Sequence, residues 1–317
     1  MKSRYETSLF QQPRLIAEVL DAKTPEWMAS LRPHPVHFVG VGTSRHAGEI
    51  ARALWKRLVS PRAECVHSFD FTRLPQSVGR GDVVVLLSHR GGDSFTVEAA
   101  KIARAAGAIT VALTAKGAAW PCELDHRLDC GELEDAKAFT RSFTSTMAWI
   151  CKWIGDKTLL RGLTAACENL AAGPAFPKLE SDTDVVLLGD LEREWVAREV
   201  ALKLQEAPYS RARSFGLEEF LHGPKLSVSR QTVVIGFAGP DEPRWAEARK
   251  HLAEAGAPFV EVGDLGLPRD ASWLGQVFWG QRLALDVCAK LGISPDEAKG
   301  AHYRRPSFLA KKSTSRR

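Results

Sequence analysis

Residues 36–58 have the sequence VHFVGVGTSRHAGEIARALWKRL, and this stretch decides the fold. Its first five residues are mostly apolar, as in a strand that is buried on both faces. A glycine-rich turn at 40–42 follows, and apolar residues then recur at helical spacing through 45–58. A buried strand, a tight turn and an amphipathic helix form the unit from which parallel α/β sheets are built.

The same unit recurs along the chain. In the first half we expect further strands at 83–88 and 109–114 and a helix at 95–106. In the second half we expect strands at 185–189, 232–237 and 258–262 and helices at 195–206 and 242–255. Strands that alternate with helices in this way predict an α/β protein with parallel sheets.

The two halves resemble each other at an offset of about 150 residues. The segment AGEIARALWKRL from Ala47 aligns with AREVALKLQEA from Ala197, and AAKIARAAGAITVAL from Ala99 aligns with EARKHLAEAGAPFVEV from Glu247. A long helical stretch at 144–172 would join the two copies. We therefore predict four parts, an N-terminal helical segment (1–34), two α/β domains (35–172 and 173–300) and a C-terminal tail (301–317).

The composition is that of an ordinary globular protein. Of the 317 residues, 44% are hydrophobic and 26% are charged, which is enough to bury a large core. The net charge is +5, but the last fifteen residues hold six basic and no acidic side chains, so the rest carries about one net negative charge. This distribution argues against a nucleic-acid partner, because such a partner requires clustered positive charge on the folded part.

The cysteines and the N-terminus indicate a cytoplasmic protein. The six cysteines are scattered, with no CxxC pair and no histidine at metal-ligand spacing, so we predict reduced thiols and neither a metal nor a cofactor. The N-terminal stretch MKSRYETSLFQQPRLI lacks the apolar segment of a secretory signal. The most apolar windows are too short to cross a bilayer, so no membrane association is expected.

The turn after the first strand has the parts of an anion site. The segment 40–44, Gly-Val-Gly-Thr-Ser, offers backbone N–H groups, two hydroxyls and a helix N-terminus. The corresponding segment of the second copy, 189–192, is Gly-Asp-Leu-Glu, whose carboxylates would repel an anion. A phosphorylated ligand would therefore bind the first copy, although the glycines could equally serve only a tight turn. The motif is neither a P-loop nor a dinucleotide fingerprint.

Three charged residues of the second copy share one helical face. Glu199, Lys203 and Glu206 are spaced at i, i+4 and i+7. A carboxylate on this face could carry a proton between neighbouring carbons, and the lysine could stabilise a developing oxyanion. The alternative is a set of surface ion pairs worth a few tenths of a kcal/mol.

Seven segments, in order along nearly the whole chain, resemble the sugar isomerase (SIS) family. They are QP at 12–13, VGVGTSRHA at 39–47, LSHRG at 87–91, TRSFT at 140–144, EVALKLQE at 199–206, EFLHGP at 219–224 and LAK at 309–311. The resemblance is strongest to the isomerase part of glutamine:fructose-6-phosphate amidotransferase and to related sugar-phosphate deaminases and isomerases. It implies two tandem three-layer αβα domains, each with a central parallel sheet of the flavodoxin type.

The resemblance also implies five catalytic residues, Glu206, His222, Lys203, Glu199 and Lys311. Glu206 matches the glutamate that moves a proton between C1 and C2, Lys203 a lysine near the C1 oxygen or amine, and Glu199 a neighbouring carboxylate. His222 matches the histidine of ring opening, which in the relatives reaches into the neighbouring subunit, so we expect a homodimer with shared active sites. Lys311 matches the tail lysine that closes over the sugar and can form a Schiff base.

Eight residues are implied in substrate binding, namely Gly42, Thr43, Ser44, Ser88, His89, Arg90, Asp93 and Thr140. Thr43 and Ser44, with the loop of Ser88, would hold the phosphate of the sugar. Thr140 could equally belong to a helix cap, since threonine hydroxyls accept N–H bonds there.

The loop at 88–93 departs from the family pattern, where relatives typically have Ser-Gln-Ser-Gly-Glu-Thr and this chain has Ser-His-Arg-Gly-Gly-Asp. Arg90 could still bind phosphate in a bidentate manner, or it could select a sulfonate or carboxylate. Asp93 would then orient the arginine or contact a substrate hydroxyl. Alternatively, Arg90 and Asp93 pair with each other at the surface and touch no ligand.

These features predict an aldose-ketose isomerase or amino-sugar-phosphate deaminase that acts on an anionic sugar, such as a hexose or hexosamine 6-phosphate. Because the chain begins Met1-Lys2 and lacks the N-terminal cysteine of the amidotransferase relatives, we expect no glutaminase activity. The alternative is a regulatory protein that senses a sugar phosphate without chemistry. The retained Glu206 and Lys311 favour the enzyme, because a sensor needs only the anion site.

Overall fold

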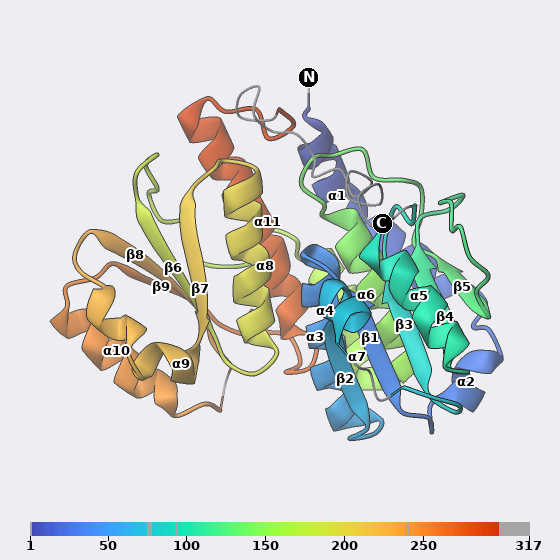
Figure 1. Ribbon diagram of the computed structural model, residues 1–317. Helices are drawn as coiled ribbons and strands as arrows, with labels where there is room; N and C mark the ends of the chain where they lie inside the picture. The colour runs from blue at the N-terminus through green and yellow to red at the C-terminus, as the bar shows by residue number, and fades with distance from the viewer. Residues whose placement is uncertain (1, 75–77, 93, 240, 298–317) are drawn as a thin grey trace, which may run out of the picture.

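The computed structural model describes residues 2–74, 78–92, 94–239 and 241–297 (Figure 1). The predicted site residues Asp93 and Lys311 and the predicted tail 301–317 lie outside the described residues. Within them the chain forms two parallel sheets. No helix in the described ranges is both long enough and apolar enough to cross a membrane.

The first sheet has the strand order β2-β1-β3-β4-β5, and every neighbouring pair is parallel. The strands are β1 (Val36–Gly40), β2 (Ala63–His67), β3 (Val83–Leu87), β4 (Ile109–Thr114) and β5 (His126–Asp129). Its helices are α3 (Thr43–Leu58), α4 (Ser68–Arg73) and α5 (Phe95–Ala105). This order is that of flavodoxin-like sheets, in which the chain changes direction between the first and third strands.

The second sheet has the order β7-β6-β8-β9 and is also parallel. The strands are β6 (Asp184–Gly189), β7 (Arg211–Gly216), β8 (Thr232–Phe237) and β9 (Phe259–Val262). Its helices are α8 (Arg193–Glu206), α9 (Leu217–Leu221), α10 (Arg244–Glu254) and α11 (Ser272–Leu291), with a short 3₁₀ turn at Pro224–Ser227. Within the described residues the second sheet therefore repeats the order of the first four strands of the first sheet.

The remaining helices surround the first sheet and connect the halves. They are α1 (Arg4–Asp21), α2 (Trp27–Leu31), α6 (Arg141–Ile154) and α7 (Lys157–Glu168). The predicted single helical stretch at 144–172 is wrong, because the helix ends at Gly155, whose φ of 74° is left-handed. Asp156 then caps α7 by accepting the Leu159 N–H at 2.8 Å.

The core is continuous between the halves. One face of each sheet contributes to a single apolar cluster that includes Trp55 of α3, Phe143 of α6, Val200 of α8 and Trp279 of α11. In Figure 1, α8 and α11 lie between the two sheets, and α8 packs against both α3 and the second sheet. Smaller clusters fill the outer faces, under α4 and α5 in the first half and under α9 and α10 in the second. Each sheet is thus covered on both faces, as parallel sheets require.

Candidate active site

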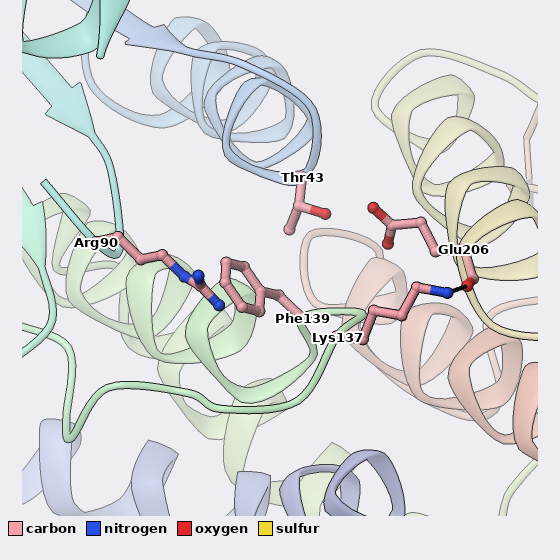
Figure 2. A pocket seen from close by; sticks show the side chains of 5 residues that line it. All are labelled: Thr43, Arg90, Lys137, Phe139 and Glu206. Atoms are coloured by element: carbon pink, nitrogen blue, oxygen red, sulfur yellow. Dashed lines mark hydrogen bonds between the residues drawn. The ribbon is translucent and has the colours of Figure 1, made fainter. Parts of the chain in front are cut away.

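A pocket of about 260 Å³ lies where the two halves meet, and it is lined by Thr43, Arg90, Lys137, Phe139 and Glu206 (Figure 2). Thr43 begins α3 directly after β1, and Arg90 lies in the loop after β3. These two loops flank the point where the strand order of the first sheet reverses, which is where α/β proteins bind ligands. Glu206 is the last residue of α8, so the second half closes the pocket.

The turn before Thr43 requires its glycines. Gly42 has a φ of 55°, and a Cβ on Gly40 would lie 2.9 Å from the Ser44 backbone carbon. This tight turn aims the N-terminus of α3 at the pocket, and the first turn of that helix holds no acidic residue. The positive end of the helix dipole therefore favours an anion at this position.

The charged face of α8 points to the same place. The Lys203 Nζ atom lies 2.7 Å from the Glu206 Oε2 atom and 3.4 Å from the Glu199 Oε1 atom. The side chains of Glu199 and Lys203 are fully buried, whereas 36% of the Glu206 side chain is exposed. The alternative of surface ion pairs is therefore wrong for Glu199 and Lys203.

A hydroxyl from the first half completes this network. Lys203 donates to the Thr43 Oγ1 atom at 3.1 Å, and the same hydroxyl donates to the Glu199 Oε1 atom at 3.3 Å. Figure 2 shows the Thr43 hydroxyl and the Glu206 carboxylate facing the same space. Three of the predicted site residues on α8 and one on α3 are thus brought together by the fold.

His46 is a member of this network that the sequence did not single out. Its Nδ1 atom lies 2.8 Å from the Glu199 Oε2 atom. Both oxygens of Glu199 are therefore occupied by groups of the protein, one by Lys203 and Thr43 and the other by His46. The Glu199 side chain is fully buried and holds the lysine in place.

The electrostatics fix the charges of the buried pair. Burial alone would raise the pKa of Glu199, but the Lys203 ammonium and the hydrogen bonds from His46 and Thr43 outweigh it, so that pKa is lowered. Burial alone would lower the pKa of Lys203, yet the carboxylates of Glu199 and Glu206 raise it well above its ordinary value. Lys203 is therefore a fixed cation, buried next to the Glu206 carboxylate that lines the pocket.

Arg90 and Phe139 form the opposite wall. The Arg90 guanidinium carbon lies 5.0 Å from the centre of the Phe139 ring, in a cation–π arrangement that Figure 2 displays. The arginine of the altered anion loop lines the pocket, and its predicted role in substrate binding stays a prediction. Its predicted relation to Asp93 falls outside the described residues.

Two residues that line the pocket, Phe139 and Lys137, were not predicted from the sequence. The Lys137 ammonium donates to the backbone oxygens of Glu206 and Glu297, at 3.0 and 3.1 Å, and to the Tyr209 hydroxyl. Lys137 thereby ties the end of α8 to the chain at Glu297. The only sequence signal was its place just before the TRSFT motif at 140–144.

Two predicted ligand-binding residues are instead part of the scaffold. His89 is 8% exposed and accepts the Glu134 N–H at 2.8 Å, and burial lowers its pKa to about 4 despite the nearby Glu134. Thr140 is fully buried and its hydroxyl donates to Glu134 at 3.2 Å. Glu134 also accepts the N–H groups of Thr140 and Ser142 at 2.9 Å each, so it caps α6. Neither His89 nor Thr140 lines the pocket.

The other predicted residues lie outside the lining. Gly42 and Ser44 flank Thr43, and Ser88 follows β3, but none of the three lines the pocket. The His222 side chain, directly after α9, is 71% exposed and contacts Glu218 in the first turn of that helix. In this chain it is therefore not brought to Glu206.

The described residues contain no group of three or more histidine, cysteine or acidic side chains that could hold a metal ion. The pocket therefore offers a partly exposed carboxylate, two cationic side chains and a helix N-terminus on its own lining, with Lys203 beneath. Such a set can bind an anionic molecule and transfer a proton.

Residues 32–151 match the family model described as SIS domain. The first half of the chain contains an SIS domain. The chain is 30% identical to the glutamine–fructose-6-phosphate aminotransferase (isomerizing) of Leifsonia xyli subsp. xyli, over 72% of this chain and 40% of that protein. It is 26% identical to the enzyme of the same name from Legionella pneumophila (strain Lens), over 88% of this chain and 51% of that protein. The chain thus spans about half the length of these relatives or less.

Solved structures show that the fold of this chain is shared across both halves. Glucosamine-6-phosphate deaminase from Thermotoga maritima has a TM-score of 0.73 at 21% identity, covering 93% of this chain and 97% of that chain. The C-terminal domain of glucosamine-fructose-6-phosphate aminotransferase from Francisella tularensis has a TM-score of 0.78 at 15% identity, covering 94% and 99%. Tagatose-6-phosphate ketose/aldose isomerase from Escherichia coli has a TM-score of 0.73 at 18% identity, covering 96% and 98%.

Proposed function

We propose that this protein catalyses aldose-ketose isomerisation of an anionic sugar, a hexose or hexosamine 6-phosphate, with or without release of ammonia. The observation that carries the proposal is the meeting of Glu206 from one half with Thr43 from the other in a single pocket. The Lys203 ammonium lies 2.7 Å from that carboxylate. A base, a fixed cation and an anion site are the parts that such a reaction needs.

These positions support the following reaction. Glu206 removes the proton from the carbon next to the carbonyl, and the carbonyl oxygen gains negative charge as the enediol forms. The charge of Lys203 stabilises that oxygen, Glu206 returns the proton to the neighbouring carbon, and the hydroxyl proton of the first carbon passes to the former carbonyl oxygen. No atom or electron is gained or lost in this isomerisation. With an amino sugar the same proton transfer forms an imine, and one water molecule from the solvent hydrolyses it to the ketone and ammonia.

The anionic group would bind at the first sheet. The N-terminus of α3 and the Arg90 guanidinium both face the pocket, and arginine can bind phosphate or sulfonate through two parallel hydrogen bonds. The relatives support this proposal, because their names include an isomerizing aminotransferase, a glucosamine-6-phosphate deaminase and a ketose/aldose isomerase of tagatose 6-phosphate.

We also propose that the two halves, 35–172 and 173–300, are two SIS-type domains and that two chains share their active sites. The exposed His222 would then reach the pocket of a second copy and assist ring opening, since it does not reach its own. Lys311 would close over the sugar, as the family resemblance implies, and Asp93, where the loop departs from the family, would orient Arg90 or contact a substrate hydroxyl.

The test is proton exchange with solvent. The purified protein is incubated in deuterium oxide with hexose 6-phosphates, hexosamine 6-phosphates and a 6-sulfo sugar, and deuterium at C1 or C2 is measured by NMR. Exchange is expected with at least one of them. Glu206→Gln should lower its rate by about 10² to 10⁴, the usual cost of losing a general base.

Glu254→Gln, an exposed change on α10, is the matched control and should leave the rate unchanged. Binding of these sugars without exchange would contradict the enzyme and favour a sugar-phosphate sensor. Equal exchange rates in the wild type and Glu206→Gln would remove Glu206 from the mechanism.

A further inference from the structure

Lys137 is fixed in the first half of the molecule, although its ammonium reaches the second. Ala136 and Ala138, its neighbours in the chain, are fully buried. Glu134, three residues before Lys137, accepts the Thr140 backbone N–H at 2.9 Å, which holds this segment against the start of α6. The Lys137 side chain therefore extends from a backbone that has little freedom to move.

The Lys137 ammonium contacts the end of the helix that carries the proposed base. It donates to the backbone oxygen of Glu206, the last residue of α8, at 3.0 Å (Figure 2). The last carbonyl groups of a helix have no donor within the helix, so Lys137 satisfies one of them and places a positive charge at the negative end of the helix dipole. The contact joins two residues that are 69 positions apart, one in each half.

The same ammonium holds Tyr209, three residues after Glu206. Tyr209 has a φ of 59°, in the left-handed region that residues other than glycine seldom adopt. Its hydroxyl accepts a hydrogen bond from Lys137, and the centre of its ring lies 4.3 Å from the Lys137 Nζ atom. A strained backbone persists only where its surroundings fix it. The turn by which the chain leaves Glu206 is therefore also fixed by Lys137.

Each N–H group of Lys137 has an acceptor in the protein. The third acceptor, besides Glu206 and Tyr209, is the backbone oxygen of Glu297 at 3.1 Å. An ammonium has three N–H groups, so an anionic ligand would have to displace one of these oxygens to accept a hydrogen bond from Lys137. The contacts of Lys137 are thus those of a residue that holds the protein in place, although it lines the pocket.

We propose that Lys137 is a positioning residue that sets the place of the Glu206 base relative to the anion-binding residues of the first half. The Glu206 carboxylate is already linked to that half, because Lys203 lies 2.7 Å from it and donates to Thr43 at 3.1 Å. Lys137 supplies the second link, at the Glu206 backbone. A sugar held at Thr43 then meets a base whose side chain and backbone are both held from the same half. This proposal rests on the proposed function.

Lys137→Met tests this role, because methionine fills a similar space without N–H donors. The rate of deuterium incorporation is measured over a range of sugar concentrations. We expect kcat to fall by about 10- to 100-fold, since proton transfer depends steeply on the position of the base, and KM to change by less than about threefold. Lys250→Met, an exposed change on α10, is the matched control and should leave both constants unchanged.

Tyr209→Phe is a milder variant, which remains informative if Lys137→Met does not fold. It removes one acceptor of Lys137 and keeps the ring, so kcat should fall by about two- to tenfold, as for the loss of one hydrogen bond.

Backbone amide hydrogen exchange, followed by mass spectrometry, is a readout that does not depend on activity. In Lys137→Met the amides of residues 203–210 should exchange faster than in the wild type, whereas those of α10 should exchange at the same rate.

Three results would overturn the proposal. The first is a large rise in KM with kcat unchanged in Lys137→Met, which would make Lys137 an anion-binding residue. The second is an unchanged kcat in both folded variants, and the third is unchanged amide exchange at 203–210 in Lys137→Met. A wild type that incorporates deuterium into no sugar would contradict the proposed function instead. Faster amide exchange at 203–210 would then still support the contact between Lys137 and the end of α8, and unchanged exchange would overturn it.

Discussion

At the scale of single residues, the charge of Lys203 depends on Glu199. Both side chains are fully buried, and their nitrogen and oxygen atoms are 3.4 Å apart. Glu199→Gln would leave the buried ammonium with Glu206 as its remaining carboxylate. We expect a loss of about 3 kcal/mol in the free energy of unfolding at neutral pH, at the lower end of the range for breaking a buried pair. Urea unfolding of the wild type and the variant measures this difference.

The same pair predicts a pH dependence. The pKa of Glu199 is lowered from 4.5, so its stabilisation is present above pH 4.5 and is lost as the pH falls through its folded-state value. The pKa of Lys203 is raised from 10.5, so its stabilisation is present below pH 10.5 and is lost as the pH rises further. The difference in the free energy of unfolding between wild type and Glu199→Gln should therefore be largest between pH 4.5 and pH 10.5, and it should shrink in acid.

Glu18→Gln breaks an exposed pair with Arg14 at the same i, i+4 spacing, and it should cost less than about 1 kcal/mol. A loss as small as this in Glu199→Gln, or one that does not shrink in acid, would show that the buried pair does not contribute as described.

At the scale of elements, the loop after β3 depends on Gly91. Its φ is 57°, and a Cβ at this position would lie 2.3 Å from the Ala119 backbone oxygen. Gly92 has a similar φ of 66° but open space around it. Gly92→Ala should therefore cost only the left-handed strain of about 1 to 2 kcal/mol. Gly91→Ala carries the same strain and must also displace the backbone. It should therefore lower the free energy of unfolding, measured in urea, by more than Gly92→Ala does.

Because Arg90 precedes Gly91, the displacement should also move the guanidinium that lines the pocket. Under the proposed function, Gly91→Ala should raise the KM for the anionic sugar more than Gly92→Ala does. Equal stability and equal KM in the two variants would contradict the close approach of the loop to Ala119.

At the scale of the whole molecule, a buried ion network connects the halves. Arg57 of α3 donates to Glu192 at 3.3 Å and, through Nε, to Asp270 at 2.6 Å. Glu192 is fully buried and also contacts Arg193 at 3.2 Å. Arg57→Ala should lower the free energy of unfolding by about 2 to 4 kcal/mol, because it leaves the buried Glu192 carboxylate with one partner fewer.

Since one apolar core extends through both halves, wild type and Arg57→Ala should each unfold in a single transition. Circular dichroism and tryptophan fluorescence, recorded along the same urea series, should give coincident curves. Arg161→Ala, on the exposed side of α7, is the control and should change stability by less than about 0.5 kcal/mol. Two separate transitions in the wild type would show that the halves are stabilised independently.

Local patterns were sufficient for most of the scaffold. The central strands β1, β3, β6 and β8 were predicted because both of their faces are buried, which gives short continuous apolar runs. The strands β2, β5 and β7 were missed. They lie at the edges of their sheets and carry polar residues, as in AECVH, HRLD and RARSFG, so they lack that signal.

The candidate site could be predicted only where a motif kept its residues close in the sequence. The spacing of Glu199, Lys203 and Glu206 places them on one face of any helix, and the Gly-Val-Gly-Thr-Ser turn places N–H groups at the start of another. The sequence did not give Lys137 and Phe139 a role, because a lysine and a phenylalanine before a helix carry no local signature of a pocket. It assigned His89 and Thr140 to the ligand, whereas Glu134 engages both within the scaffold.

The sequence alone therefore determined the central elements, their parallel arrangement and the chemistry available on them, because these follow from the periodicity of neighbouring residues. Only the tertiary structure decided which of those groups meet. Thr43 and Glu206 belong to different halves, and the packing of α8 against α3 brings them into one pocket. The same packing buries Glu199 and Lys203 and leaves His222 exposed. Burial and proximity depend on contacts between distant parts of the chain, and no local pattern records them.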